Sequence, residues 1–147
     1  MFEYKIRPAL ESESAQIKDL IYLVRINPAG LNWKRFMVAI LEDGRLIGCG
    51  QIKPHGADVN EVASIAVSPL YRGRGIARKI IEELLRNPAR PLYLMCIAHN
   101  GPMYLKFGFN PIPFEQMPRY FQRIQKVFDI ADYFRKSGEE LLVMRLE

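Results

Sequence analysis

The stretch Ser64 to Leu85, SIAVSPLYRGRGIARKIIEELL, contains the signals that decide the fold. It opens with an apolar strand ending at Val67, and a proline turn follows. Gly73 and Gly75 come next, among basic residues. Residues 76–86 then place apolar side chains at i, i+4 and i+8, which indicates an amphipathic helix. This order predicts an anion site on the loop, because backbone N–H groups at a helix N-terminus attract phosphate.

The spacing of the glycines distinguishes between the known phosphate motifs. The nucleoside-triphosphate loop G-x-x-x-x-G-K-[ST] is absent from the sequence. The dinucleotide fingerprint G-x-G-x-x-G has Arg78 where its third glycine belongs, and the predicted strand 92–97 lacks the terminal acidic residue that binds ribose. The pattern [RQ]-x-x-G-x-[GA] fits residues 72–77, RGRGIA. It suits a pyrophosphate held by backbone N–H groups and surrounded by basic side chains.

The remaining elements predict one mixed α/β domain. Strands are expected at Phe2–Arg7, Phe36–Leu41, Leu46–Ile52, Val59–Val67, Leu92–Ile97 and residues 139–146. Helices are expected at residues 17–24, Ile76–Arg86 and Met103–Phe107, with one or two more within residues 114–137. Asp43-Gly44 between two apolar runs is a strong hairpin signal. The sheet is therefore antiparallel early in the chain, with a parallel crossover through the helix at 76–86.

Composition agrees with one globular domain spanning residues 1–147. The chain is 49% hydrophobic and 25% charged, and no apolar run reaches the roughly 18 residues of a membrane span. Because the start is charged from residue 3 onward, it does not resemble a secretory signal, and we expect a cytoplasmic protein. Cys49 and Cys96 lie in apolar runs and are expected to be reduced and buried, and no spacing suits a metal. The net charge of +5 fits nucleic acid, a membrane surface or an anionic cofactor, and alone it selects none of them.

Two segments together resemble the GNAT superfamily of N-acetyltransferases. The stretch 64–85 resembles its acyl-CoA-binding motif, and MYLKFGF at 103–109 resembles its short helix ending in Y-x-K-x-G-F. The two motifs occur in the family's order, about 30 residues apart, and the resemblance covers about residues 1–111 and 139–147. It implies a mostly antiparallel sheet flanked by helices, with a splayed parallel strand pair. Residues 114–137 would be a helical insert before the last strand.

The resemblance also implies a site for acetyl-CoA as co-substrate, without a metal. The pantetheine arm would lie beside the backbone of Ile65, Ala66 and Val67. The pyrophosphate would bind the N–H groups of Arg72, Gly73, Arg74, Gly75, Ile76 and Ala77. Asn100 stands near where some members contact CoA. Those members place the asparagine about seven residues before the tyrosine of the second motif, whereas here the gap is four.

For catalysis the resemblance implies Tyr104 as general acid to the leaving thiolate and Glu61 as a candidate general base. A base is needed because an ammonium must lose a proton before it attacks a thioester. A solvated carboxylate at the start of the strand is an equally good interpretation of Glu61. In a regular strand Glu61 would lie about 13 Å from Ile65, so it would act through water unless the strand bulges. His55 and His99 are alternatives by chemistry, although ordinary loop histidines are the favoured interpretation.

The acceptor remains open between protein N-termini, lysines, amino acids and polyamines. We expect a small-molecule or peptide amine as partner, and neither nucleic acid nor a membrane. An apolar acceptor wall is suggested by Trp33, Phe114, Met117 and Tyr120. The apolar stripe from Phe121 to Phe134 is interpreted as core or as the interface of a homodimer. The alternative function is a catalytically silent acyl-CoA sensor.

Overall fold

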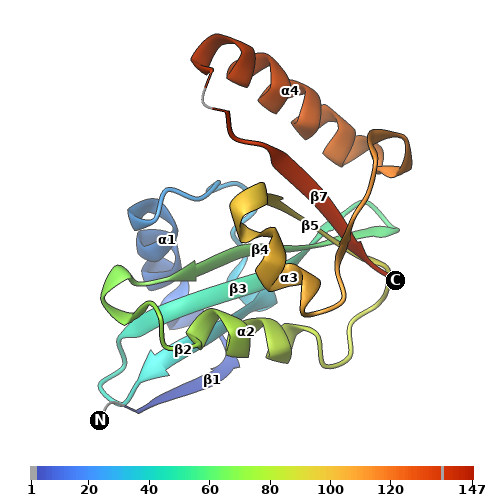
Figure 1. Ribbon diagram of the computed structural model, residues 1–147. Helices are drawn as coiled ribbons and strands as arrows, with labels where there is room; N and C mark the ends of the chain where they lie inside the picture. Colours follow the sequence, from blue (N-terminus) through green and yellow to red (C-terminus); the bar gives the residue numbers. More distant parts are fainter. Residues whose placement is uncertain (1–2, 137) are drawn as a thin grey trace. The chain divides into compact units, whose positions relative to one another are not determined.

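The computed structural model describes residues 3–136 and 138–147 of the chain (Figure 1). Its strands are β1 Tyr4–Pro8, β2 Phe36–Leu41, β3 Leu46–His55, β4 Val59–Val67, β5 Leu92–Ile97, β6 Asn110–Pro111 and β7 Leu141–Leu146. Its α-helices are α1 Ser14–Leu23, α2 Ile76–Leu84, α3 Gly101–Leu105 and α4 Arg119–Arg135. Phe2 and Ser137, which fall within predicted segments, lie outside the described residues.

The described strands form one mixed sheet in the order β1-β2-β3-β4-β5-β7-β6. The pairs β1–β2, β2–β3, β5–β7 and β6–β7 are antiparallel, whereas β4–β5 is parallel. In the described part of the chain, the parallel pairing joins only Asn60 to Leu92 and Glu61 to Tyr93, although both strands continue beyond these residues. The predicted fold class, a mostly antiparallel sheet with a splayed parallel pair, is confirmed.

The residues divide into two compact units that share strands β3 and β4. Unit 1 comprises Met1–Lys53 and Val62–Pro88, and unit 2 comprises Pro54–Glu61 and Ala89–Glu147. The glycine loop therefore belongs to unit 1, whereas Glu61, Tyr104 and α4 belong to unit 2.

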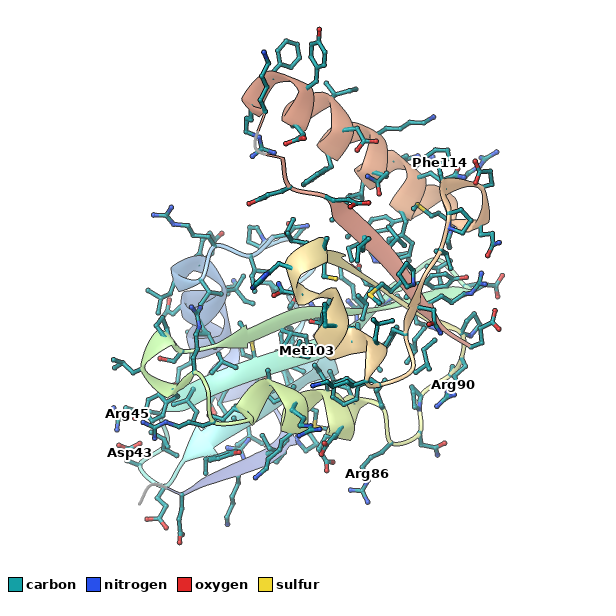
Figure 2. The ribbon with its side chains drawn as sticks, viewed as in Figure 1. Asp43, Arg45, Arg86, Arg90, Met103 and Phe114 are labelled. Atoms are coloured by element: carbon teal, nitrogen blue, oxygen red, sulfur yellow. The ribbon has the colours of Figure 1, made fainter. Side chains whose placement is uncertain are left out.

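The turn between β2 and β3 forms as the Asp43-Gly44 signal predicts. Gly44 adopts φ 89°, a conformation that favours glycine. The carboxylate of Asp43 accepts the backbone N–H of Arg45 at 3.0 Å and its Nε–H at 2.9 Å (Figure 2). These local bonds stabilise the turn that joins β2 to β3.

In unit 1 the helices α1 and α2 cover opposite faces of the sheet (Figure 1). On one face, Cys49 of β3 is buried in a cluster with Ile21 of α1. On the other face, a Cβ added at Gly48 or Gly50 would lie 3.0 or 2.9 Å from Ile80 of α2. Because β3 carries glycines here, α2 packs close to the sheet, and this contact fixes the start of α2 after the glycine loop.

In unit 2 the first turn of α4 is anchored to the sheet by Phe121. Phe121 is fully buried with Tyr93 of β5 and Val143 of β7, and its ring centroid lies 5.4 Å from that of Tyr93. The helix therefore contributes core only near its beginning. Large apolar side chains on its later turns are exposed: Val127, Ile130, Tyr133 and Phe134.

Strand β4 is not regular, because Ser64 has φ 59°. A residue with a Cβ rarely adopts this left-handed conformation, so local contacts must hold it. The buried side chain of Gln51 donates its Nε2–H to the Ser64 hydroxyl at 2.9 Å, and the Cys49 thiol contacts the Ser64 carbonyl at 3.5 Å. The estimate of 13 Å for a regular strand from Glu61 to Ile65 therefore does not apply.

Candidate active site

The glycine loop follows β4 in unit 1 and leads directly into α2. The N–H of Ser68 donates to the carbonyl of Ile47 at 2.8 Å, which ties the start of the loop to β3. The short 3-10 helix η3, Pro69–Tyr71, comes next. Gly73 and Gly75 both adopt φ 77°, so the path into α2 requires glycine at both positions.

The loop also leaves room for a ligand beside its backbone. A Cβ added at Gly73 or Gly75 would meet no atom within 4 Å. Gly75 is the N-cap of α2 and supplies no side-chain acceptor, and the first N–H groups of a helix have no acceptor within it. The helix dipole adds positive potential at this end. These features fit an anionic group such as the pyrophosphate of CoA.

The basic side chains of the loop make contacts within the protein. Arg72 donates its Nε–H to the main-chain carbonyl at the end of β4 at 3.3 Å. The guanidinium of Arg74 lies 5.6 Å from the ring centroid of Tyr71. Arg78 forms an exposed ion pair of 3.6 Å with Glu82. The loop therefore combines a backbone cradle with a positive field, and Arg72 also supports the loop itself.

The residues expected beside the pantetheine arm lie at the end of β4. Ala66 is buried in the cluster beneath α1, whereas Ile65 and Val67 are half-buried. A Cβ added at Gly50 would lie 2.5 Å from Cδ1 of Ile65, so the Ile65 side chain packs on the α2 face. The side chains are engaged in packing, and a role of their backbone groups toward CoA stays a prediction.

Tyr104 lies on α3 in unit 2, next to Met103 (Figure 2). Its side chain is buried, with its ring 6.3 Å from that of Phe109 in an edge-on arrangement. Burial, with a smaller contribution from Cys96, raises the pKa of Tyr104 to about 12. The hydroxyl therefore keeps its proton at neutral pH and can donate it or a hydrogen bond. Asn100 is the exposed N-cap residue of the same helix and its predicted role stays untested.

Glu61 is buried, contrary to the interpretation as a solvated carboxylate. Only 5% of the residue is exposed, and its Oε1 lies 2.7 Å from Nε2 of His55. His55 is the last residue of β3 and its ring stacks on Tyr120 of α4, with centroids 3.6 Å apart and planes at 19°. The expectation of an ordinary loop histidine is therefore wrong for His55, whereas His99 is exposed. One feature of the sequence could have indicated this pair: His55 ends β3 and Glu61 lies near the start of β4, so a short turn brings them close together.

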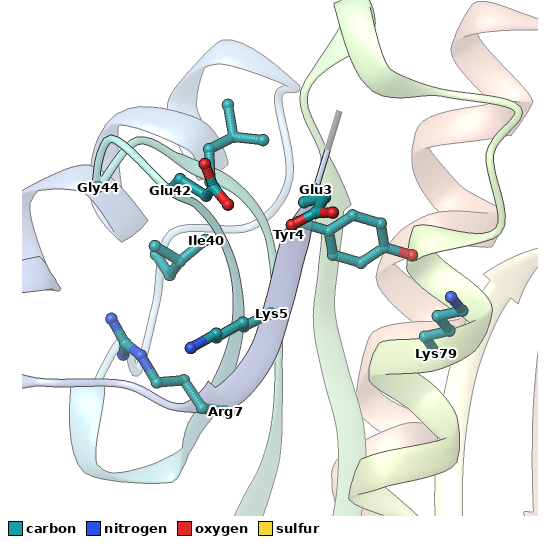
Figure 3. A pocket seen from close by; sticks show the side chains of 9 residues that line it. Glu3, Tyr4, Lys5, Arg7, Ile40, Glu42, Gly44 and Lys79 are labelled. Atoms are coloured by element: carbon teal, nitrogen blue, oxygen red, sulfur yellow. The ribbon is translucent and has the colours of Figure 1, made fainter. Parts of the chain in front are cut away.

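The suggested apolar acceptor residues divide between the two units. Trp33 packs against the core cluster of unit 1, as a packing anchor would. Phe114 and Met117 line a pocket of about 610 Å³ in unit 2, and Asp129 and Glu140 also line it. Figure 3 shows another pocket, of about 690 Å³, beside β1 in unit 1. Charged side chains of both signs line it, and it contains none of the predicted site residues.

Cys49 makes stability sensitive to high pH. Burial raises the pKa of its thiol from 9.0 to about 12. Below pH 9 the thiol is protonated in both the folded and the unfolded chain, so the folded state keeps its full stability. Between pH 9 and pH 12 the thiol loses its proton only in the unfolded chain, which favours unfolding. We expect the free energy of unfolding to fall above pH 9 by up to about 1.4 kcal/mol per pH unit from this group. Urea titrations at pH 7, 9 and 10.5 should show a smaller fall for Cys49→Ala, and an equal fall in both proteins would contradict the assignment.

None of the helices in residues 3–136 and 138–147 is both long enough and apolar enough to cross a bilayer. Within the same residues, no group of three or more His, Cys, Asp or Glu side chains is placed to hold a metal ion.

Two curated proteins align with part of the chain. The amino-acid acetyltransferase of Mycobacterium tuberculosis (strain ATCC 25618 / H37Rv) is 31% identical over 72 residues, covering 47% of this chain and 41% of that protein. A mycothiol acetyltransferase of Mycobacterium sp. (strain JLS) is 32% identical over 95 residues, covering 57% of this chain and 30% of that protein. The chain therefore spans less than half the length of these relatives.

Solved structures share the fold over nearly the whole chain. N-acetylglutamate synthase from Neisseria gonorrhoeae, complexed with coenzyme A and N-acetyl-glutamate, matches 99% of this chain and 35% of its own, with a TM-score of 0.69 and 21% identity. Rv2747 from Mycobacterium tuberculosis, in complex with CoA, matches 97% of this chain and 98% of its own, with a TM-score of 0.70 and 23% identity. A family model described as an acetyltransferase (GNAT) domain matches residues 32–111. Because that match spans more than half of the chain and includes both the glycine loop and Tyr104, the chain belongs to the GNAT acetyltransferase family.

Proposed function

We propose that the protein is an acetyl-CoA-dependent N-acetyltransferase that transfers the acetyl group to a primary amine by direct attack in a ternary complex. The observation that carries this proposal is the family match, which includes both sequence motifs. The open glycine loop at the N-terminus of α2 supports it, because its backbone fits an anionic cofactor. Acetyl-CoA supplies the activated thioester, and the chain's own residues position it and move the protons.

CoA binding is assigned to backbone groups of unit 1. The N–H groups of residues 72–77 hold the pyrophosphate, and backbone groups at Ile65–Val67 hold the pantetheine arm. The two glycines at φ 77° support this role, because they expose backbone without a side chain in the way. Asn100 of unit 2 is retained as an additional contact to CoA.

Glu61 is proposed as the general base that takes a proton from the acceptor ammonium. Its burial supports this role, because a carboxylate shielded from water is a better proton acceptor than a solvated one, and its bond to His55 holds it in one orientation. Tyr104 is proposed as the acid that protonates the leaving thiolate, and its retained proton supports this role.

Glu61→Gln should lower kcat by about 10²- to 10⁴-fold, the usual contribution of general acid–base catalysis. Affinity for acetyl-CoA should remain near that of the wild type, because Glu61 and the glycine loop belong to different units. Steady-state rates and calorimetry on the same preparations test this. Glu115→Gln is the control, because Glu115 is an exposed carboxylate of unit 2. Full activity of Glu61→Gln would refute the role of Glu61 as general base.

The acceptor is proposed to be the amine of a small molecule or peptide. Two relatives are named as acetyltransferases of an amino acid and of mycothiol, which supports a small acceptor. The pocket lined by Phe114 and Met117, with two carboxylates also in its lining, would suit an amine with an apolar part. Amino acids, polyamines, aryl-alkyl amines and short peptides should be assayed for release of free CoA thiol. Binding of acetyl-CoA without thiol release across the whole panel would favour the silent sensor instead.

A further inference from the structure

His55 and Glu61 are hydrogen-bonded to each other inside unit 2. A separation of 2.7 Å between Nε2 and Oε1 is a short hydrogen bond, so one proton must lie between the two atoms. The side chains are 12% and 6% exposed, so water competes little for this bond. A carboxylate with one oxygen fixed in this way has its second oxygen oriented as well.

The His55 ring is held by α4. Tyr120 stacks on it at 3.6 Å, and Phe121 meets it edge-on at 6.0 Å. Phe121 is fully buried in the core of unit 2, which anchors this turn of the helix. The charge of Glu61 is also felt on α4, because burial and then Glu61 raise the pKa of Tyr120. The first turn of α4 therefore forms one wall of the His55–Glu61 pair.

We infer that His55 is a positioning residue for the general base and that Tyr120, from the helical insert, clamps the His55 ring. The inference rests on the proposed function of Glu61 as base. His55 donates Nε2–H to Oε1 of Glu61, and this bond fixes the orientation of the carboxylate that accepts the proton from the ammonium. It gives the insert a role in the site.

The experiment separates the hydrogen bond from the packing at His55. His55→Phe keeps a ring on Tyr120 and removes the donor, and should lower kcat by about 10²-fold, as a misplaced catalytic group does. The KM for acetyl-CoA should not change. His55→Gln keeps an N–H donor without a titratable ring, and should recover most of the lost kcat. If His55→Gln is as defective as His55→Phe, His55 does not act by positioning.

The clamp is tested on α4 with a matched pair of tyrosines. Tyr120→Leu removes the stacked ring and should lower kcat about tenfold, whereas Tyr120→Phe keeps the ring and should recover most of that loss. Tyr133→Leu is the control, because Tyr133 lies on the same helix and is 76% exposed. Equal rates for Tyr120→Leu and Tyr133→Leu would refute the clamp.

Glu61→Gln, assayed in the same series, separates failure of the proposed base from failure of the positioning role of His55. If Glu61→Gln is inactive while His55→Phe matches the wild type, the base stands and the positioning role fails. If Glu61→Gln retains full activity, the proposed base itself fails. Circular dichroism and thermal unfolding of every variant confirm that each protein is folded, and calorimetry with CoA checks that unit 1 still binds the cofactor.

Discussion

Gly75→Glu is expected to lose CoA binding by at least about 100-fold. The carboxylate would project beside the backbone that holds the pyrophosphate and repel it. Loss of two charge-assisted hydrogen bonds, at about 1.5–3 kcal/mol each, corresponds to this factor. Titration calorimetry with CoA measures it directly.

The control for Gly75→Glu is Gly44→Glu. Gly44 has φ 89° and open space around it, so glutamate there carries a similar backbone strain at a distance from the loop in sequence. Both variants should lose similar stability, and only Gly75→Glu should lose CoA. Gly75→Lys has similar bulk and the opposite charge. It therefore separates charge repulsion of the pyrophosphate from steric obstruction of its site. Wild-type affinity in Gly75→Glu would refute the placement of the pyrophosphate.

Tyr104→Phe is expected to lower kcat by about 10²- to 10³-fold, within the range of general acid catalysis. Affinity for CoA should change little, because the ring and its contact with Phe109 remain. In the wild type, with a pKa of about 12 for Tyr104, the hydroxyl stays protonated to about pH 11, so this group should not limit the rate at moderately alkaline pH. Rates measured with saturating substrates and calorimetry with CoA test the two expectations separately.

Tyr93→Phe is the matched control, because Tyr93 is also a buried tyrosine of unit 2. It should retain wild-type kcat. Equal losses of kcat and of CoA affinity in Tyr104→Phe would show that Tyr104 has a structural role.

Local signals made much of the fold predictable. Strands β2 and β5 have the predicted bounds, because short apolar runs end at turn residues such as Asp43-Gly44 and at the proline before Leu92. The start of α2 was also predictable, because two glycines and an apolar stripe mark it. The glycine loop could be assigned from sequence for the same reason: its chemistry resides in consecutive backbone groups.

Features that depend on contacts between distant residues were not predictable. Nothing in the residue type of Ser64 indicates φ 59°, which depends on the buried side chain of Gln51. The surroundings of His55 depend on Tyr120, which lies some 60 residues later on the insert. A solvated carboxylate and a loop histidine were reasonable interpretations of each residue alone. The contacts of His55 with Glu61 and Tyr120 change both interpretations.

Direct transfer is tested most directly by mass spectrometry of the protein and of its products. With acetyl-CoA alone, the account predicts an unmodified protein and no release of thiol. With an amine that serves as acceptor, it predicts free CoA and N-acetylated amine in equal amounts. An acetylated protein that forms without amine and then passes its acetyl group on would contradict the account.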